Sequence, residues 1–406
     1  MKLKVGFIYG GISTEHEISI ISAIQAINNM NMDKYDIVPI YLSKKGVFYT
    51  GKYLLNIDNY KDLSLIPKKC KEVSIIKKNN DFVLLNVNFP HKVLTNIDIF
   101  FPIVHGYNTE DGSIAGFLET IGAPYAESDL YASLIGQDKV IQKMVFKENG
   151  INIAPYTYFY ENEYLDNENE IISKINKLSY PVIVKPATTG SSVGINVCDD
   201  ESSLKEAIDE AVQYDSKIVV EEVVEDLKEV NIAVMGNYEH QKVSEIEEVL
   251  SCNKFLTYTD KYIGGGKTKG KLKTPVKGAS KGMASASRKL PADLDDDVRK
   301  EVERVAKEAF KVLGSSGNSR IDFLIDRKDN KVYLNEINSI PGSLAFYLWD
   351  AKDINFTKVL DDMINIGIKD YKKRVSKTHS FETNILAGFA SNGGLKGAKG
   401  VKGKLR

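Results

Sequence analysis

The first third of the chain alternates apolar runs with amphipathic stretches. Strand-like runs at residues 5–9, 37–41 and 97–104 are separated by helical spacing over residues 17–28 and 113–121. Shorter strand-like pieces lie around polar turns in residues 42–95. Alternation of buried strands with amphipathic helices indicates an open α/β layer whose loops gather at the strand ends.

The middle of the chain has a different pattern. Helical spacing predicts helices over residues 137–148 and 203–213, and a buried strand-like run over residues 181–185 ends at Lys185. Three more strand-like runs follow in close succession, and we expect them to form one antiparallel sheet. They are residues 218–222, 230–235 and 243–249.

The pattern is clearest near the C-terminal end. Residues 295–313 have helical spacing, an acidic start and Gly314 at the end, as the helix dipole and C-cap preferences favour. Residues 321–325 and 331–335 flank an Asp-Asn turn and predict a β-hairpin. The Gly/Lys-rich tail from Ser376 fits no packed element.

Residues 264–289 differ from the rest in composition. They carry eight basic residues, no acidic residue and many glycines. Such a segment cannot bury much apolar surface, so we expect a mobile loop.

Charge and cysteine content exclude several classes of protein. The 54 basic and 55 acidic residues nearly cancel, to a formal net charge of -1, so no overall field marks a nucleic-acid or membrane-surface protein. Three scattered cysteines indicate reduced thiols rather than disulfides or a CxxC metal site. No run approaches the about 18 apolar residues of a membrane helix, and the apolar start is too short for a signal peptide. We expect a soluble, cytoplasmic protein.

Oxygen-bearing side chains gather on the expected hairpin. Glu336 and Asn338 are two positions apart and therefore share a face of their strand, and Asp322 lies on the neighbouring strand. Two carboxylates and an amide suit Mg²⁺, which prefers one or two carboxylates plus substrate phosphates. A solvated hairpin face is the alternative. Pro341-Gly342 follows directly and predicts a turn with exposed backbone N–H groups.

Lys185 ends a buried strand, where an ammonium group is costly without an anionic partner. The Gly190-Ser191-Ser192 segment beyond it can fold over phosphates and donate N–H and hydroxyl groups. No GxxxxGK[ST] match occurs, so this is not a P-loop, and an ordinary turn is the alternative.

A third group lies at the ends of the first strands. Glu15 follows a glycine pair and precedes a helix whose positive end tolerates anions. His105 and Glu110 lie on a later loop at the same edge of the expected sheet. Together they predict a clamp for an amino acid.

Seven motifs, in order and over residues 3–365, resemble the D-alanine–D-alanine ligase family. They are Gly10-Gly11 with Glu15, Glu17 and Ser19; His105-Gly106 with Glu110-Asp111-Gly112; Asp138-Lys139; Lys185-Pro186 with Gly190-Ser191-Ser192-Val193-Gly194; Tyr258 with Lys261-Tyr262; Arg320-Ile321-Asp322; and Asn335-Glu336-Ile337-Asn338 with Pro341-Gly342. The resemblance implies an ATP-grasp fold, with ATP between two α+β subdomains behind an α/β N-terminal domain. We expect domains at 1–125, 126–216 and 217–375, a basic lid at 257–290 and a tail at 376–406.

The resemblance also implies residues that hold ATP and metal. Lys139 and Lys185 resemble the lysines on the ATP phosphates, with Ser192 in the phosphate-covering segment. Glu221 or Glu222, together with Glu229, resembles the acidic residues that contact the adenine and ribose of ATP. Asp322, Glu336 and Asn338 resemble the family's ligands for two Mg²⁺ (or Mn²⁺).

Substrate and catalytic roles follow by the same carry-over. Glu15 resembles the residue that holds the ammonium group of the first amino acid, with His105 beside it. Ser191 and Tyr258 resemble residues that fix Glu15, and Lys261 resembles the loop lysine that reaches the γ-phosphate. Arg320 and the backbone near Gly342 resemble the groups that stabilise the oxyanion.

Departures from the family pattern concentrate around the second substrate. Leu256 stands where an aromatic residue is usual. Tyr347 stands where a serine usually binds the second substrate's carboxylate, unless Ser343 supplies the hydroxyl from another position. Thr109 replaces a glycine and alters the His105 loop, and Gln137 replaces a methionine. The insertion after Lys261 is either a solvated lid or a surface that attracts an anionic acceptor.

We therefore expect an ATP-dependent ligase that joins D-alanine to a second D-amino acid through an acyl phosphate, for cell-wall peptidoglycan precursors. Its partners would be small amino acids and a second copy of itself in a homodimer. Two alternatives stay open: a paralogue whose second substrate is D-lactate, D-serine, another amino acid or a peptide, and a non-catalytic nucleotide-binding protein of the same fold.

Overall fold

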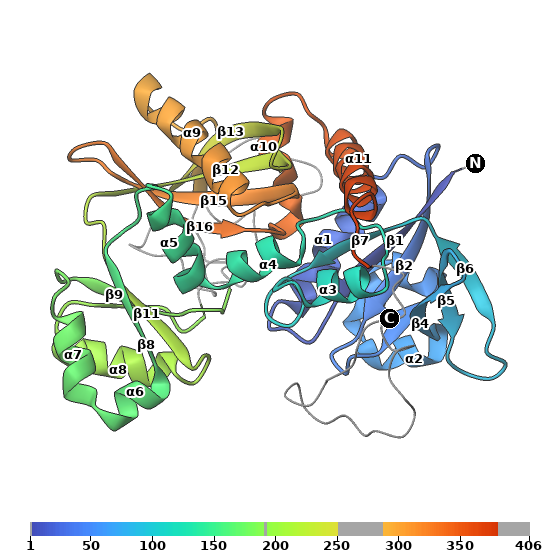
Figure 1. The fold of residues 1–406 in the computed structure, drawn as a ribbon, viewed down its shortest axis with the longest axis horizontal. Coiled ribbons are helices and arrows are strands. Elements are labelled where there is room, and N and C mark those ends of the chain that lie inside the picture. Colours follow the sequence, from blue (N-terminus) through green and yellow to red (C-terminus); the bar gives the residue numbers. More distant parts are fainter. Residues whose placement is uncertain (1, 191–192, 251–286, 381–406) are drawn as a thin grey trace, which may run out of the picture.

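Three β-sheets lie along the long axis of the molecule, each with its own helices (Figure 1). The structure, a computed structural model, describes residues 2–190, 193–250 and 287–380. The predicted combination of an α/β N-terminal part with α+β parts behind it is confirmed.

The N-terminal part contains a seven-stranded sheet in the order β6-β5-β4-β3-β2-β1-β7. Only β2, β1 and β7 run parallel, and the other neighbours pair antiparallel. The strands are β1 (Leu3–Gly10), β2 (Tyr35–Leu42), β3 (Phe48–Thr50), β4 (Lys71–Lys78), β5 (Asp81–Asn86), β6 (Val93–Ile97) and β7 (Ile99–Val104). The predicted α/β layer is thus extended by an antiparallel flank from the short pieces of residues 42–95.

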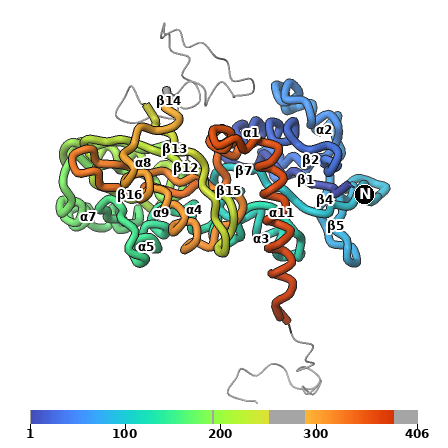
Figure 2. The backbone as a smooth tube through the Cα atoms, turned by 90° about the horizontal axis from the view of Figure 1, so that it is seen from above, coloured from blue at the N-terminus to red at the C-terminus, as the bar shows by residue number. Residues whose placement is uncertain are grey.

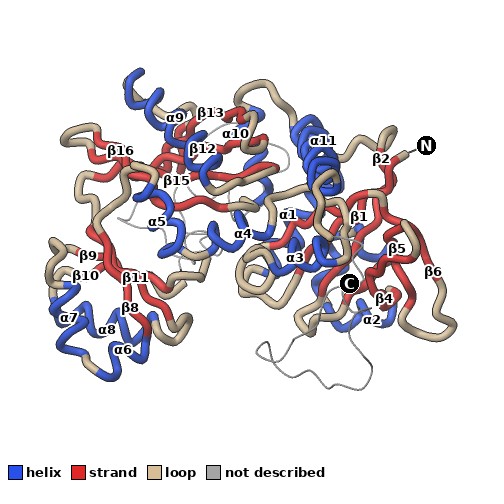
Figure 3. Tube along the Cα trace, in the orientation of Figure 1, coloured by secondary structure: helices blue, strands red, loops and turns tan. Residues whose placement is uncertain are grey.

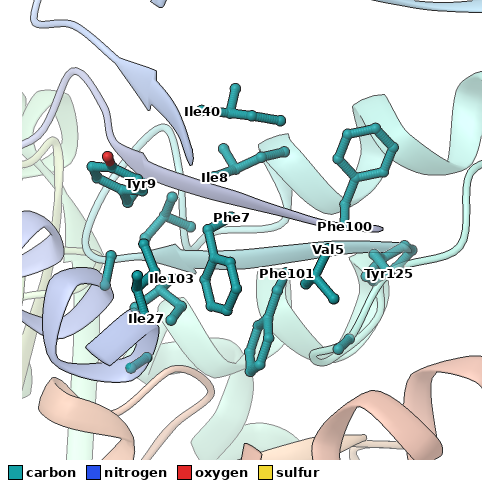
Figure 4. Packing of buried hydrophobic residues seen from close by; sticks show 14 of the residues in the cluster. Val5, Phe7, Ile8, Tyr9, Ile27, Ile40, Phe100, Phe101, Ile103 and Tyr125 are labelled. Atoms are coloured by element: carbon teal, nitrogen blue, oxygen red, sulfur yellow. The ribbon is translucent and has the colours of Figure 1, made fainter. Parts of the chain in front are cut away.

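Helices cover the parallel part of this sheet. They include α1 (His16–Asn28), α3 (Ser113–Thr120) and the C-terminal α11 (Phe356–Val375), with the short α2 (Ile66–Lys69) at the flank. The core has aromatic residues from adjacent strands in contact, such as Phe7 on Phe101 with ring centroids 5.2 Å apart (Figure 4). Burial on both faces explains why β1 and β7 are nearly continuous apolar runs. In Figure 2, α11 crosses this part and leads away from it at its C-terminal end.

The second sheet has four antiparallel strands in the order β10-β9-β11-β8. They are β8 (Tyr156–Tyr160), β9 (Val182–Pro186), β10 (Asn196–Cys198) and β11 (Lys217–Glu222). Its helices, α6 (Glu161–Asp166), α7 (Glu168–Ile175) and α8 (Glu201–Ala211), gather on one face (Figure 3). The opposite face is thereby left for the site.

The third sheet has five antiparallel strands in the order β14-β13-β12-β15-β16. They are β12 (Leu227–Gly236), β13 (Gln241–Leu250), β14 (Ser287–Lys289), β15 (Gly317–Asp326) and β16 (Lys331–Asn338). The amphipathic helix α9 (Asp296–Val312) buries its apolar stripe against β12, β13, β15 and β16, and α10 (Phe346–Asp350) contacts β12 and β13. The predicted hairpin is confirmed as β15 and β16.

The predicted helix over residues 137–148 is confirmed as α5 (Lys139–Glu148), whereas the helix before it, α4 (Leu130–Gln137), was not predicted. Asp138 separates them because its backbone is extended and its side chain caps the backbone N–H groups of Val140 and Ile141; this is the normal behaviour of an Asp N-cap.

The predicted three-stranded sheet was wrong. The first of its runs, β11, pairs with β8 and β9 in the four-stranded sheet, whereas β12 and β13 belong to the five-stranded sheet. Strand-like periodicity cannot tell which neighbour a strand pairs with, so the boundary between sheets was missed. No helix among the described residues is long and apolar enough to span a bilayer.

Candidate active site

One cavity is formed jointly by the N-terminal part, the α4–α5 segment and the five-stranded sheet. Many of its lining side chains are charged or polar. Those singled out by the sequence are Glu15, His105, Lys139, Glu229, Arg320, Asp322, Glu336, Asn338 and Tyr347, with the backbone of Gly342. Positions up to 332 residues apart in the chain, from Glu15 to Tyr347, thus meet at one place.

The β15–β16 hairpin supplies the oxygen-rich wall. In the strand register Asp322 lies opposite Glu336, and Arg320 lies opposite Asn338. Arg320 donates two hydrogen bonds of 2.7 Å to the two oxygens of Asp322, and Asn338 Nδ2 lies 3.2 Å from Asp322 Oδ2. The predicted common face of Asp322, Glu336 and Asn338 is therefore present, and Arg320 shares it.

This donor set fits a magnesium ion in its chemistry. Mg²⁺ is bound through one or two carboxylates together with substrate phosphates, and Asp322, Glu336 and the amide of Asn338 provide two carboxylates and a carbonyl. Among the described residues, no three His, Cys, Asp or Glu form a metal-binding group alone, so phosphate oxygens would have to complete the shell. Both carboxylate oxygens of Asp322 accept hydrogen bonds from Arg320, so Asp322 would have to share them between Arg320 and the metal ion.

Lys185 lies at the end of β9 and has the anionic partner that its burial requires. Its Nζ is 3.1 Å from Glu221 Oε2 and 3.3 Å from Asn335 Oδ1. The Nζ of a second lysine, Lys143, also lies 3.1 Å from Glu221 Oε2. Burial alone would raise the pKa of Glu221, but the two ammonium groups lower it, so the carboxylate stays charged.

Sequence reasoning missed Lys143. It is buried, and burial lowers its pKa against the opposing effect of Glu221. The signal was present, since Lys143 is four residues after Lys139 and therefore lies on the same face of α5. Lys139 itself donates to the carbonyl of Thr189 at 2.6 Å and lies 3.9 Å from Glu336.

Glu221 and Glu222 lie on opposite faces of β11, because successive side chains of a strand alternate between faces. Glu221 faces the lysines, whereas Glu222 accepts a hydrogen bond from the backbone N–H of Ser179, away from the cavity. The geometry does not support Glu222 as a nucleotide contact. Glu229, further along on β12, lines the cavity.

Glu15 is enclosed by two glycine-containing loops. A Cβ atom at Gly190 would lie 2.6 Å from Glu15 Oε2, and one at Gly106 would lie 2.8 Å from it. Side chains at either position would displace the carboxylate. Both glycines are therefore needed for this close approach, which brings the Lys185 segment and the His105 loop onto the same group.

His105 is fully enclosed, and burial lowers its pKa to about 4. Its ring is therefore neutral at physiological pH, and Nε2 lies 3.0 Å from Ser22 Oγ. Thr109, the departure from the family pattern on this loop, is buried and donates to the carbonyls of His105 and Gly106. Thr109 in place of glycine therefore stabilises the His105 loop through these hydrogen bonds.

Glu110 joins the His105 loop to the Pro-Gly turn. One carboxylate oxygen accepts from the N–H of Gly106 and the other from the N–H of Ile340, both at 3.0 Å. Burial and the charge of Glu15 raise the pKa of Glu110 to about 8. The sequence indicated this residue as part of a motif, but not its bond to the distant turn.

The side of the cavity next to Arg320 contains Tyr347, whose hydroxyl donates to Glu247 at 2.6 Å. Arg288 stacks on the Tyr347 ring, 4.6 Å from its centroid. Ser343, the other candidate hydroxyl, is not among the residues that line the cavity. It is buried against α1, where its hydroxyl and Gln25 Oε1 are 2.6 Å apart. Glu247 and Arg288 were also missed by sequence reasoning.

Five expected site residues cannot be placed. Ser191, Ser192, Leu256, Tyr258 and Lys261 lie outside the described residues. Most of the basic segment lies there as well, and only its last residues are described, as β14.

The two antiparallel sheets that face a lysine-, arginine- and carboxylate-lined site define an ATP-grasp protein. Family models match most of the chain: "D-ala D-ala ligase N-terminus" over residues 4–128 and "D-ala D-ala ligase C-terminus" over residues 145–365. This chain belongs to the D-alanine–D-alanine ligase family, and it is an ATP-dependent ligase.

Individual relatives are similar in sequence to this chain over nearly its whole length. D-alanine–D-alanine ligases of Thermosipho africanus and Thermosipho melanesiensis are 39% and 36% identical, each over 95% of this chain and 98% of the relative. Among solved structures, the VanG D-Ala:D-Ser ligase of Enterococcus faecalis has a TM-score of 0.73 at 28% identity, covering 90% of this chain and 100% of that one. The ligase of Coxiella burnetii has a TM-score of 0.74 at 25% identity, covering 92% and 96%.

Proposed function

We propose that this protein joins two D-alanine molecules, with ATP converted to ADP and phosphate, for peptidoglycan precursor synthesis. The observation that carries the proposal is one cavity lined by the carboxylate of Glu15, the ammonium group of Lys139 and the Arg320–Asp322–Glu336–Asn338 wall. The names of the curated relatives support D-alanine as both substrates.

In the first half-reaction the carboxylate of one D-alanine attacks the γ-phosphate. Two anions meet in this step, so catalysis depends on charge neutralisation and alignment. We assign Glu15 to the D-alanine ammonium group, Lys139 and Lys185 to the nucleotide phosphates, and Arg320 to the transferred phosphate. Bound Mg²⁺, held by Asp322, Glu336 and Asn338, would supply further positive charge at the phosphates.

In the second half-reaction the amine of the other D-alanine attacks the acyl carbon and phosphate leaves. The tetrahedral oxyanion needs donors fixed in advance. We assign this task to Arg320 and the backbone near Gly342, which Glu110 holds in place through Ile340. The acyl phosphate hydrolyses readily, so an enclosed site favours ligation.

Product analysis with a panel of substrates tests the proposal. Purified protein is given ATP and Mg²⁺ with D-alanine alone, or with D-alanine plus D-serine, D-lactate, other amino acids or short peptides. Phosphate release and D-alanyl-D-alanine with D-alanine alone are expected. Turnover only with another second substrate would establish the paralogue instead, and no turnover with any pair would leave a nucleotide-binding protein. Neither alternative is favoured by the relatives.

We also propose a cytoplasmic homodimer, as the family resemblance implies. Size measurement by light scattering tests the second part. A mass near twice 45.3 kDa is expected, and a mass equal to one chain would contradict it.

A further inference from the structure

Arg288 stands out among the basic residues of the cavity because it is held from two sides. Its guanidinium stacks on the Tyr347 ring at 4.6 Å, and Nη1 lies 3.3 Å from Glu247 Oε2. The side chain nevertheless keeps 26% of its surface exposed and lines the cavity. A planar guanidinium fixed on an aromatic face is preorganised to bind a carboxylate with two N–H groups.

Glu247 does not depend on Arg288 alone. The Tyr347 hydroxyl and the Asn231 amide both approach its Oε1, at 2.6 and 3.2 Å. These two neutral donors satisfy Oε1, whereas Oε2 is buried and accepts no hydrogen bond within the described part of the chain, so it depends on the charge of Arg288. Arg288 therefore has to keep its pair with Glu247 when it binds a ligand, and Glu247 and Tyr347 fix its position.

The other cations of the lining already have tasks in the proposed reaction. Among the described residues that line the cavity, the Lys and Arg side chains are Lys139, Arg288 and Arg320. Lys139 is assigned to the phosphates, and Arg320 is bound in two places by Asp322 and assigned to the transferred phosphate. An amino acid that enters second brings its own carboxylate, which needs a cation of its own.

The hydroxyl of Tyr347 cannot take this role without losing its short bond to Glu247. We propose that Arg288, braced by Tyr347 and Glu247, binds the carboxylate of the second amino acid and so determines which acceptors react. The inference rests on the proposed function and names the recognition element for its acceptor. It requires an acceptor that carries a carboxylate next to the attacking amine.

A competition between two acceptors tests this directly. The enzyme receives ATP, Mg²⁺, D-alanine and an excess of D-alaninamide, which has the amine but no carboxylate. Mass spectrometry then gives the ratio of D-alanyl-D-alanine to D-alanyl-D-alaninamide. For Arg288→Gln, we expect this ratio to fall about 10- to 100-fold, the value of a charge-assisted hydrogen-bond pair, with the KM for ATP unchanged.

Control variants separate recognition from structure. Arg304→Gln makes the same change on α9, where Arg304 pairs with Glu301 and Glu308 of the same helix, and should keep the wild-type ratio. Arg288→Gln with Glu247→Gln removes both charges together, so it tests the proposal even where the single variant folds poorly. Its ratio should fall as well.

The outcomes are distinct. An unchanged product ratio in both Arg288 variants, or an equal loss of both products, overturns the role of Arg288 and leaves the ligase function standing. A wild-type enzyme that forms neither product from D-alanine overturns the proposed function itself. A lowered ratio with retained total turnover supports the assignment.

Discussion

Glu127 has two features that are unfavourable in a folded protein. Its carboxyl group is buried, with neither oxygen hydrogen-bonded among the described residues, and its φ of 148° lies in a region that favours glycine. Burial and the nearby Glu110 raise its pKa well above the ordinary value. The folded protein therefore takes up a proton here that the unfolded chain releases.

The sign of the pH dependence follows from this shift. A carboxyl group with a raised folded pKa favours the folded state at low pH, and that stability is lost as pH rises above the unfolded pKa of about 4.3. For Glu127→Gln, we expect a stability gain over wild type that grows with pH, by up to about 1.4 kcal/mol per pH unit. Urea unfolding between pH 4 and 8 measures it, with the exposed Glu206→Gln as control; a constant difference would contradict the prediction.

Lys143 is a second residue whose effect can be measured. Lys143→Met leaves Glu221 with one cation instead of two, so we expect a loss of about 3 kcal/mol of unfolding free energy. The KM for ATP should rise, because Lys185 is then the only ammonium group beside Glu221. Lys147→Met, on the exposed side of the same helix, is the control, and equal stability of the two variants would refute the role of Lys143.

Individual site residues were predictable where a local element, such as a hairpin or a strand end, sets their position. Asp322, Glu336 and Asn338 are placed by hairpin pairing, and Lys185 by the end of its strand. Lys143, Glu247 and Arg288 escaped because each is defined by a partner from another strand or helix. Arg288, for example, contacts Tyr347 from a helix 59 positions later in the chain.

Among the elements, the β15–β16 hairpin is the one with the sharpest functional consequence. For Glu336→Gln, we expect turnover to fall by about 100-fold or more, the usual loss when a preorganised charge at a reacting group is removed, while the fold stays intact. Phosphate release and thermal unfolding measure the two effects. Asp329→Asn at the exposed tip of the same hairpin should change neither, and near-normal turnover of Glu336→Gln would refute its role.

Elements were predictable where local pattern suffices. Helices α1, α8 and α9 and strands β1, β2, β12 and β13 lie within a few residues of the expected ranges. The sheet to which β11 belongs and the helix break at Asp138 were not foreseen. The first depends on long-range pairing, and the second on a capping residue that apolar periodicity alone does not reveal.

At the scale of the whole molecule, Glu110 links the N-terminal part to the Pro-Gly turn after the five-stranded sheet. For Glu110→Gln, an amide N–H₂ must face one of the two backbone N–H groups. We expect a loss of about 1–3 kcal/mol of stability and about a tenfold lower turnover with an unchanged KM for ATP. Glu206→Gln at an exposed position of α8 is the control, and wild-type turnover of Glu110→Gln would contradict the link.

The paired bonds between Arg320 and Asp322 have a consequence for how the protein meets its metal supply. A guanidinium already balances the acidic wall, so the hairpin does not have to wait for a divalent ion before its strands close. Under the proposed role of magnesium, chain assembly and metal loading would be separate events, and a cell short of magnesium would hold folded enzyme that is idle rather than unfolded.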